Sequence, residues 1–424
     1  MNWFAKLFYH YRRTLKAIRI FFIISGPGII VMLADNDAGG ITTYAATGAK
    51  YGYSLIWFLL LLLPIAYYIQ EMTVRLGAVT KRGLAEAIFD SFGSHWGWFA
   101  LLDLMLVNWL TLVTEFIGMT TALSIFKIPP IVTVIVVCLF MGVMVVRGRY
   151  WTWEKVSLLF CALNLIYIPC AFLVKPSLES VLHQGLIPHF PGGSFNEFFF
   201  MLMANIGTTI APWMIFFQQS SVVDKGLQEK DIIWGQMDTI IGAAFTVVVA
   251  IFIMIVTGTL LKGIEINSAD QAVLLLMKNH KYIGVFLAIG LFNAGLLGAI
   301  CISLASSWAF GEVFGWAHSL NHKVKEAPWF YFFYFLILVS SASVVLIPNA
   351  PLVTITLFVQ VIAVTLLPAV LVFLMLLLND EKIMGQYKNT LSQNIITGSI
   401  AVAIIILATL YAFSALFPNM FPTM

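Results

Sequence analysis

The chain has 424 residues, of which 61% are hydrophobic and only 10% are charged, with a formal net charge of +3. Soluble domains carry about 25% charged residues. This composition therefore excludes a water-soluble fold, and the small positive charge gives no reason to expect a nucleic-acid partner. It predicts an all-α, polytopic membrane protein.

A helix that crosses a membrane needs roughly 20 apolar residues, and eleven segments of the chain meet this requirement. They cover about residues 20–48, 54–77, 97–125, 129–147, 155–175, 196–220, 234–261, 283–316, 329–348, 351–378 and 395–417. The connections between them are short. Residues 20–424 are therefore predicted to form a single transmembrane domain, preceded by a cytoplasmic segment at residues 1–19.

The first of these segments is interrupted by residues 35–40, which read Asp-Asn-Asp-Ala-Gly-Gly. An Asp at the centre of a membrane helix costs roughly 2.5–3.5 kcal/mol on insertion scales, and each glycine weakens a helix by about 1 kcal/mol relative to Ala. Membrane proteins tolerate such a sequence where unwound backbone lines a cavity that binds a ligand. The interruption therefore predicts a protein that moves an ion across a membrane.

The sixth segment carries a second interruption, from Gly207 through two threonines to Pro212. Proline removes a backbone donor and clashes with the preceding turn, so this stretch alone is typical of a simple kink. Breaks in the first and sixth helices, five spans apart, are however what two inverted five-helix repeats produce. We expect one repeat at about 20–175, a second at about 196–378, and an extra helix at about 395–417.

The basic residues predict the orientation, because cytoplasmic loops of membrane proteins are enriched in Lys and Arg. With the N-terminus inside, 17 of the 23 Lys and Arg residues fall on the cytoplasmic side. We therefore expect an integral protein of the plasma membrane (the cell's inner membrane), with the N-terminus in the cytoplasm and the C-terminus outside. The basic start leads into a full-length span, unlike a cleavable signal peptide. The four cysteines lie within apolar spans and are expected to be core residues rather than disulfide partners.

Five short stretches near the N-terminus match the pattern of a known family. They are Gly-Pro-Gly at 26–28, Asp-Ala-Gly-Gly at 37–40, Tyr-Ala-Ala-Thr-Gly-Ala-Lys-Tyr-Gly-Tyr-Ser-Leu-Ile-Trp at 44–57, Arg-Leu-Gly at 75–77 and Gly-Leu-Ala-Glu at 83–86. In these stretches the chain resembles the Nramp divalent-metal transporters, and the resemblance continues more weakly through the tenth helix. It implies a LeuT-type fold of eleven transmembrane helices, with the metal held between the breaks of helices one and six.

The departures from this family concern its metal ligands. Where the family reads Asp-Pro-Gly-Asn, this chain runs from Asp37 to Gly40, which keeps the carboxylate and loses the Asn ligand. Where the family reads Met-Pro-His, residues 211–213 are Ala-Pro-Trp, so the thioether ligand and a histidine implicated in proton movement are absent. Gln360 matches the helix-ten glutamine that contacts metal in the family.

Further departures concern the polar residues of helices three and nine. The family carries an acidic pair spaced three apart on helix three, whereas this chain has Glu115 but Leu112. The family carries arginines on helix nine, and here no arginine follows Arg149. Glu115 is then either a proton carrier or a polar contact between helices. This pattern resembles the Nramp-related magnesium transporter branch rather than the manganese and iron importers.

The chemistry of the remaining residues favours a hard cation. Sulfur ligands select softer transition metals, whereas oxygen ligands suit Mg²⁺, which gives up its water reluctantly. The candidate metal ligands are Asp37, Gln360 and Thr208. The site is expected to be lined by Gly40, Ala211, Ala38, Asn36 and Asp35, with helix breaks at Gly39, Gly207 and Pro212 and a polar pathway through Glu115 and Trp213. Asp35 and Asn36 remain open, because they could instead cap or solvate the broken end of the first helix.

The sequence therefore predicts uptake of a divalent cation by alternating access, with Mg²⁺ as the main substrate, Mn²⁺ as a candidate second substrate, and no proton coupling. The metal is a substrate, so no cofactor is expected. The expected partners are the metal ion and the lipid bilayer, without an obligate protein partner. The alternatives are a proton-coupled Mn²⁺ or Fe²⁺ transporter, an Al³⁺ transporter, and an intramembrane transferase. We do not expect an enzyme, because a transferase needs a second acidic cluster near a membrane face.

Overall fold

The computed structural model describes residues 20–416, apart from 148, 193, 265, 267–268 and 348–351. The predicted N-terminal segment at 1–19 lies outside the described residues. The described residues form helices and no strand. In chain order these are α2 (Pro27–Ala34), α3 (Ala38–Tyr51), α4 (Ile56–Thr80), α5 (Leu84–Phe92), α6 (Ser94–Ser124), α7 (Pro130–Arg147), α8 (Tyr150–Asn164), α9 (Tyr167–Val174), α10 (Leu178–Leu186), α11 (Phe195–Gly207), α12 (Pro212–Lys225), η1 (Glu229–Asp231), α13 (Ile232–Leu260), α14 (Ala269–Asn279), α15 (Lys281–Phe314), α16 (Pro328–Val344), α17 (Leu352–Asn379), α18 (Glu381–Met384), η2 (Gly385–Tyr387) and α19 (Leu391–Leu416).

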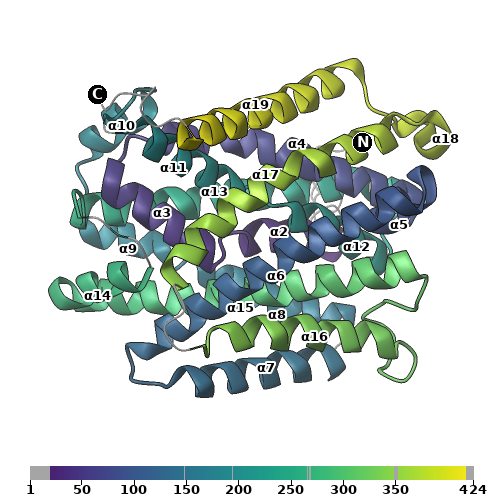
Figure 1. The fold of residues 1–424 in the computed structure, drawn as a ribbon, viewed down its shortest axis with the longest axis horizontal. Helices are drawn as coiled ribbons and strands as arrows, with labels where there is room; N and C mark the ends of the chain where they lie inside the picture. The colour runs from purple at the N-terminus through teal and green to yellow at the C-terminus, as the bar shows by residue number, and fades with distance from the viewer. Residues whose placement is uncertain are drawn as a thin grey trace, which may run out of the picture.

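Most helices run along the long axis of the molecule, with α5 and α18 at one end of the bundle and α10 and α14 at the other (Figure 1). Nine helical segments in the described part of the chain are long and apolar enough to cross a membrane. The broken pair of α2 and α3 and the 17-residue α16 provide two further crossings. The eleven-helix membrane architecture predicted from the sequence is confirmed.

The broken helices lie inside the bundle and the last helix lies at its edge. In the segment Phe195–Lys225, which contains α11 and α12, 83% of the apolar window is buried, against 22% for α19. Helix α13 packs against α2, α3 and α4, and α15 packs along α6. In Figure 1, α6 and α15 cross the middle of the molecule, while α19 runs along the upper edge. The fold therefore surrounds both interruptions with helices and leaves the predicted extra helix exposed to lipid.

Helix α2 is anchored at its first turn by an acidic side chain of α13. It begins at Pro27, whose fixed φ suits the first helical position, after Gly26 with φ 151°. The backbone N–H groups of Gly26 and Gly28 both donate to Asp238 Oδ2, at 3.0 and 2.6 Å. A carboxylate is favourable at a helix N-terminus, where unpaired N–H groups carry partial positive charge. The short half-helix is thus held at the end remote from its break.

A buried ion pair ties the end of α12 to the same place. Lys225 Nζ donates to Glu154 Oε1 of α8 at 2.6 Å, with side chains only 2% and 3% exposed. The same ammonium donates to the carbonyl of Ser25, immediately before α2, at 2.8 Å. The outer ends of both half-helices α2 and α12 therefore meet at one charged cluster.

Candidate metal site

The two helix breaks lie directly against each other. Helix α2 ends at Ala34 and α3 begins at Ala38, while residues 208–211 separate α11 from α12. The hydroxyl of Tyr44 on α3 donates to the carbonyl of Thr208 at 3.2 Å and forms a second hydrogen bond with Thr209 Oγ1 at 3.0 Å. The two helix breaks therefore adjoin, as a metal site between helices one and six requires.

The first break is shorter than the sequence suggests, because Asp37 restarts the helix. Its Oδ1 accepts from the N–H of Gly40 at 2.6 Å, which makes Asp37 the N-cap of α3. Ala38, Gly39 and Gly40 consequently form the first helical turn rather than unwound backbone. Gly207, by contrast, is the last residue of α11, and Pro212 is the first of α12.

Three oxygen atoms approach Gly40 closely. A Cβ atom added at Gly40 would lie 2.5 Å from Thr208 Oγ1, 3.0 Å from the carbonyl oxygen of Asp35 and 3.3 Å from Asp37 Oδ1. We call this group of oxygens around Gly40 the Gly40 cradle. A hydroxyl, a carbonyl and a carboxylate are the ligand types that hard divalent cations prefer.

Gln360 of α17 reaches both breaks. A Cβ at Gly39 would lie 2.1 Å from Gln360 Nε2, and a Cβ at Gly207 would lie 2.0 Å from the Gln360 carbonyl oxygen. Both glycines are thus required for the close approach of α17. The structure brings Gln360 to the same place as Asp37 and Thr208, the other two candidate ligands.

Glu115 of α6 lies against the start of α3. Its Oε2 accepts from the N–H of Ala38 at 3.1 Å. A Cβ at Gly298 of α15 would touch Glu115 Oε2 at 2.9 Å and Asp37 Cβ at 3.1 Å, so the two acids are neighbours. Glu115 therefore supports the helix start that also positions Asp37.

Several polar atoms around the breaks are buried without a hydrogen-bond partner. These are both carboxylate oxygens of Asp35, Asn36 Oδ1, Glu115 Oε1, Thr208 Oγ1 and Gln360 Nε2. Buried polar groups in proteins are normally paired, and each unpaired group is costly. Five of these six atoms are oxygens, and such a set fits a cation with its water ligands rather than an apolar or anionic ligand.

The remaining predicted residues contact other groups around the two breaks. Asn36 turns its amide toward α13, where Nδ2 donates to the carbonyl of Thr246 at 3.1 Å. Ala211 lies just before α12, and its N–H donates to Met214 Sδ at 3.3 Å. Trp213 is fully buried and packs edge-on against Phe217.

Sequence reasoning missed Tyr44 and Thr209. Tyr44 follows Gly40 by one helical turn, so helical spacing alone places it on the face of α3 that carries the cradle. Within the described residues, no group of three or more His, Cys, Asp or Glu side chains could hold a metal ion. The candidate site depends instead on single carboxylates combined with hydroxyl, amide and carbonyl groups.

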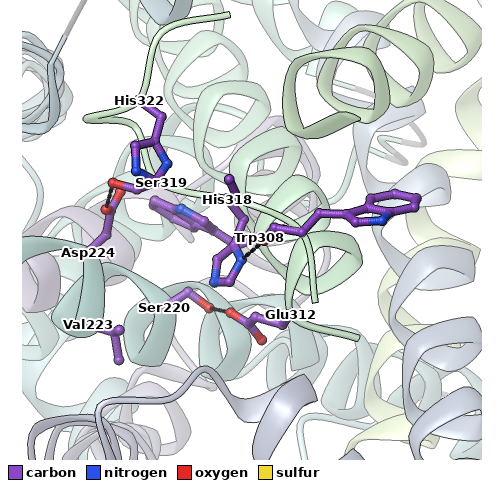
Figure 2. Close-up of a pocket in the computed structure, with 10 residues that line it drawn as sticks. Ser220, Val223, Asp224, Trp308, Glu312, His318, Ser319 and His322 are labelled. Atoms are coloured by element: carbon purple, nitrogen blue, oxygen red, sulfur yellow. Dashed lines mark hydrogen bonds between the residues drawn. The ribbon is translucent and has the colours of Figure 1, made fainter. Parts of the chain in front are cut away.

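A separate polar cavity of about 380 Å³ lies at the far end of α12 (Figure 2). Glu312 on its wall accepts from Ser220 Oγ at 2.5 Å and from the N–H of Ala85 at 3.1 Å. Asp224 accepts from the hydroxyl of Ser319 and from the N–H of Leu320. None of the predicted metal ligands lines this cavity. Glu312 links α15 to α12 and α5, and Asp224 links α12 to the loop after α15.

Comparison with known proteins agrees with this architecture. The family described as natural resistance-associated macrophage protein-like matches residues 28–414. The chain is 26% identical over 411 residues to the Nramp 2 homolog of Dictyostelium discoideum, covering 92% of this chain but only 63% of that protein. It is also 26% identical to the divalent metal cation transporter MntH of Staphylococcus saprophyticus, over 91% of this chain and 90% of that one.

The fold is similar to that of a solved metal transporter. The manganese transporter of Eremococcus coleocola superposes with a TM-score of 0.75 at 19% identity, covering 93% of this chain and 86% of that chain. Its identity to this chain is low, so the likeness concerns the fold. The family match spans nearly the whole described chain, including both helix breaks. The chain belongs to the Nramp family and has the LeuT-type membrane fold of that family.

Proposed function

We propose that this chain carries divalent metal cations across a membrane by alternating access, with Mg²⁺ as its main substrate and Mn²⁺ as a second one. The proposed ligands are the Asp37 carboxylate, the Gln360 side-chain amide and Thr208. Relatives named as divalent metal cation transporters support the general activity. The chain spans 63% of the Dictyostelium relative, so its substrate is argued from its own residues.

The Gly40 cradle carries the choice of a hard cation. The three heavy atoms nearest to the Cβ position of Gly40 are a hydroxyl, a carbonyl and a carboxylate oxygen. Mg²⁺ takes octahedral oxygen at about 2.0–2.1 Å and keeps several waters. The sulfur of Met214 is engaged by the N–H of Ala211 at the start of α12. A site of this composition favours Mg²⁺ over softer ions.

The orientation and organisation of the chain are part of the proposal. We place the protein in the plasma membrane with a cytoplasmic N-terminus and an external C-terminus, because Lys and Arg are concentrated in the loops that this orientation puts inside. The two repeats at about 20–175 and 196–378 each begin with a broken helix. The protein is proposed to act as a transporter rather than an enzyme, with the metal as cargo and no resident cofactor or obligate protein partner.

A proton-coupled Mn²⁺ or Fe²⁺ transporter is the second candidate, because Glu115 lies beside Asp37. Two adjacent acids offer a place where a proton could accompany the metal. The sequence lacks the family's other proton-linked groups at Leu112 and Trp213, which favours uncoupled transport.

Flux measurements on purified protein in liposomes test this proposal. We expect saturable Mg²⁺ uptake that Mn²⁺ inhibits competitively. Protein that moves Mn²⁺ or Fe²⁺ but excludes Mg²⁺ at millimolar concentration would refute the choice of substrate. Absence of any divalent flux, in protein that is folded by size-exclusion chromatography, would refute the transport function itself.

A further inference from the structure

Asp35, in the first helix break, has a buried carboxylate that nothing in the described chain neutralises. The side chain is 1% exposed, and neither of its oxygens has a hydrogen-bond partner. None of the ion pairs formed by the described residues includes Asp35. The charge that acts on it electrostatically is that of another acid, Asp37. A buried carboxylate normally requires a cation, a proton or several donors.

The carboxylate does not cap the broken helix. Asp35 ends α2 through its backbone, because its N–H donates to the carbonyl of Val31 at 3.2 Å while its side chain makes no hydrogen bond. Asp37 caps the helix that follows. Capping of the broken helix therefore does not explain the acid at position 35.

The backbone of Asp35 lies beside the candidate ligands. Its carbonyl oxygen is one of the oxygens of the Gly40 cradle. The hydroxyl of Tyr44, which joins the two breaks through Thr208, lies within electrostatic reach of the carboxylates of both Asp35 and Asp37. Thr208 contributes an independent sign of a ligand, because the residue is 1% exposed and its Oγ1 is unpaired and lies in the cradle.

We propose that Asp35 is a specificity-determining residue of the metal site, whose carboxylate accepts hydrogen bonds from the water ligands of the cation held at Asp37. This inference rests on the proposed function. Two carboxylates balance the charge of a divalent ion. Because Mg²⁺ retains its water and softer ions shed it more readily, an acid that binds through water favours Mg²⁺. Asp37 supplies the negative charge that holds the ion, and Asp35 selects for its hydration.

The test compares Asp35→Asn with wild type, using Mg²⁺ and Cd²⁺ as separate substrates in liposome flux and in calorimetric binding. The substitution keeps the shape and removes the charge. We expect the KM for Mg²⁺ to rise at least tenfold and the KM for Cd²⁺ to change less than threefold. Asp103→Asn is the matched control. Asp103, on α6, is likewise a buried acid with an unpaired oxygen. It lies about 18 Å along α6 from Glu115 and is therefore remote from the proposed site.

A second measurement does not depend on the variant. Hexaamminecobalt(III) has the size of hydrated Mg²⁺ and does not exchange its ligands, so it binds only through its outer hydrogens. We expect it to compete with Mg²⁺ for the wild-type protein and to lose at least tenfold in potency against Asp35→Asn. Asp35→Glu, which restores the charge, should recover most of the Mg²⁺ affinity.

Three outcomes would overturn the inference. An unchanged KM for Mg²⁺ in folded Asp35→Asn would show that a proton, not the cation, neutralises this acid. Equal losses for Mg²⁺ and Cd²⁺ would show that Asp35 does not act on hydration. If Asp35→Asn does not fold, absence of competition by hexaamminecobalt(III) in wild type would refute it. In each case Mg²⁺ transport by wild type leaves the proposed function standing, whereas absence of all divalent flux removes both.

Discussion

The N–H of Ala38 donates to Glu115 Oε2 at 3.1 Å, so an acid of α6 fastens the first residue of α3. Asp37, one residue earlier, caps the same turn from within the chain. Two acids thus hold one helix start. Their negative charge lies at the positive end of the α3 dipole, which offsets part of the cost of burying them. The proposed metal site therefore lies at a helix N-terminus that is already occupied by protein carboxylates.

Asp37→Ala should abolish saturable Mg²⁺ flux. The substitution removes the carboxylate that faces the cradle and also the N-cap of α3, whose loss typically costs about 1 kcal/mol. Asp37→Asn keeps a capping oxygen without the charge, so it separates the two effects. Liposome flux is the measurement, with size-exclusion chromatography to check folding. Normal uptake in both variants would place the site elsewhere.

Gly40→Ala should raise the KM for Mg²⁺ at least tenfold. The added methyl would lie 2.5 Å from Thr208 Oγ1, so it would push apart the three oxygens of the cradle. The matched control is Gly398→Ala on α19, where a Cβ makes only an ordinary contact of 3.8 Å. A Gly40→Ala variant with wild-type kinetics would contradict the assignment of the cradle.

Ala211→Met should shift selectivity toward softer ions. A thioether at this position restores the ligand type that favours transition metals, so the preference for Cd²⁺ over Mg²⁺ should increase at least tenfold in competition flux. Ala211→Leu adds similar bulk without sulfur and should leave the preference unchanged. If both variants behave alike, bulk rather than ligand chemistry governs selectivity at this position.

Transport should proceed without proton movement. The membrane potential contributes roughly 2.3 kcal/mol per charge per 100 mV, so about 4.6 kcal/mol for a divalent ion. At about 1.4 kcal/mol per tenfold, this supports an accumulation of roughly three orders of magnitude. Liposomes with an internal pH dye and a potassium-valinomycin clamp give the measurement. Mg²⁺-dependent acidification that persists at zero potential would show coupling, and Glu115→Gln would then test whether that acid carries the proton.

Lys225→Met should destabilise the protein by about 3–5 kcal/mol, because it leaves the carboxylate of Glu154 buried and unpaired. The double variant Lys225→Met with Glu154→Leu removes both charges and should recover much of this loss. Thermal unfolding in detergent, analysed as a double-mutant cycle, measures the coupling. If the double variant loses at least as much unfolding free energy as the two single variants together, the ion pair does not stabilise this end of α2 and α12.

The sequence predicted the helices and both breaks because apolar length and glycine or proline interruptions are local properties. Proline alone was not a sufficient signal: Pro64 and Pro368 lie inside the continuous helices α4 and α17, where each removes only one backbone hydrogen bond. The extent of the first break was misjudged because a cap can be recognised only when its acceptor and donor are considered together, as with Asp37 and Gly40.

The partners across the site could not be predicted in the same way. Glu115 meets Ala38 through a contact between α6 and α3, and Gln360 meets Gly39 through one between α17 and α3. Such pairs depend on how helices cross, and helix crossing is set by packing over the whole bundle rather than by nearby residues. The resemblance to a known family supplied Gln360, whereas Tyr44 could be found only from its helical spacing of four residues from Gly40.

The position of Gln360 has a mechanical consequence. Its side chain packs against Gly39 and its backbone packs against Gly207. Gln360 therefore lies between the two helix breaks and contacts both. Any displacement of Gln360 would therefore change the packing at both helix breaks at once, and a larger side chain at Gly39 or at Gly207 would push α17 away from both.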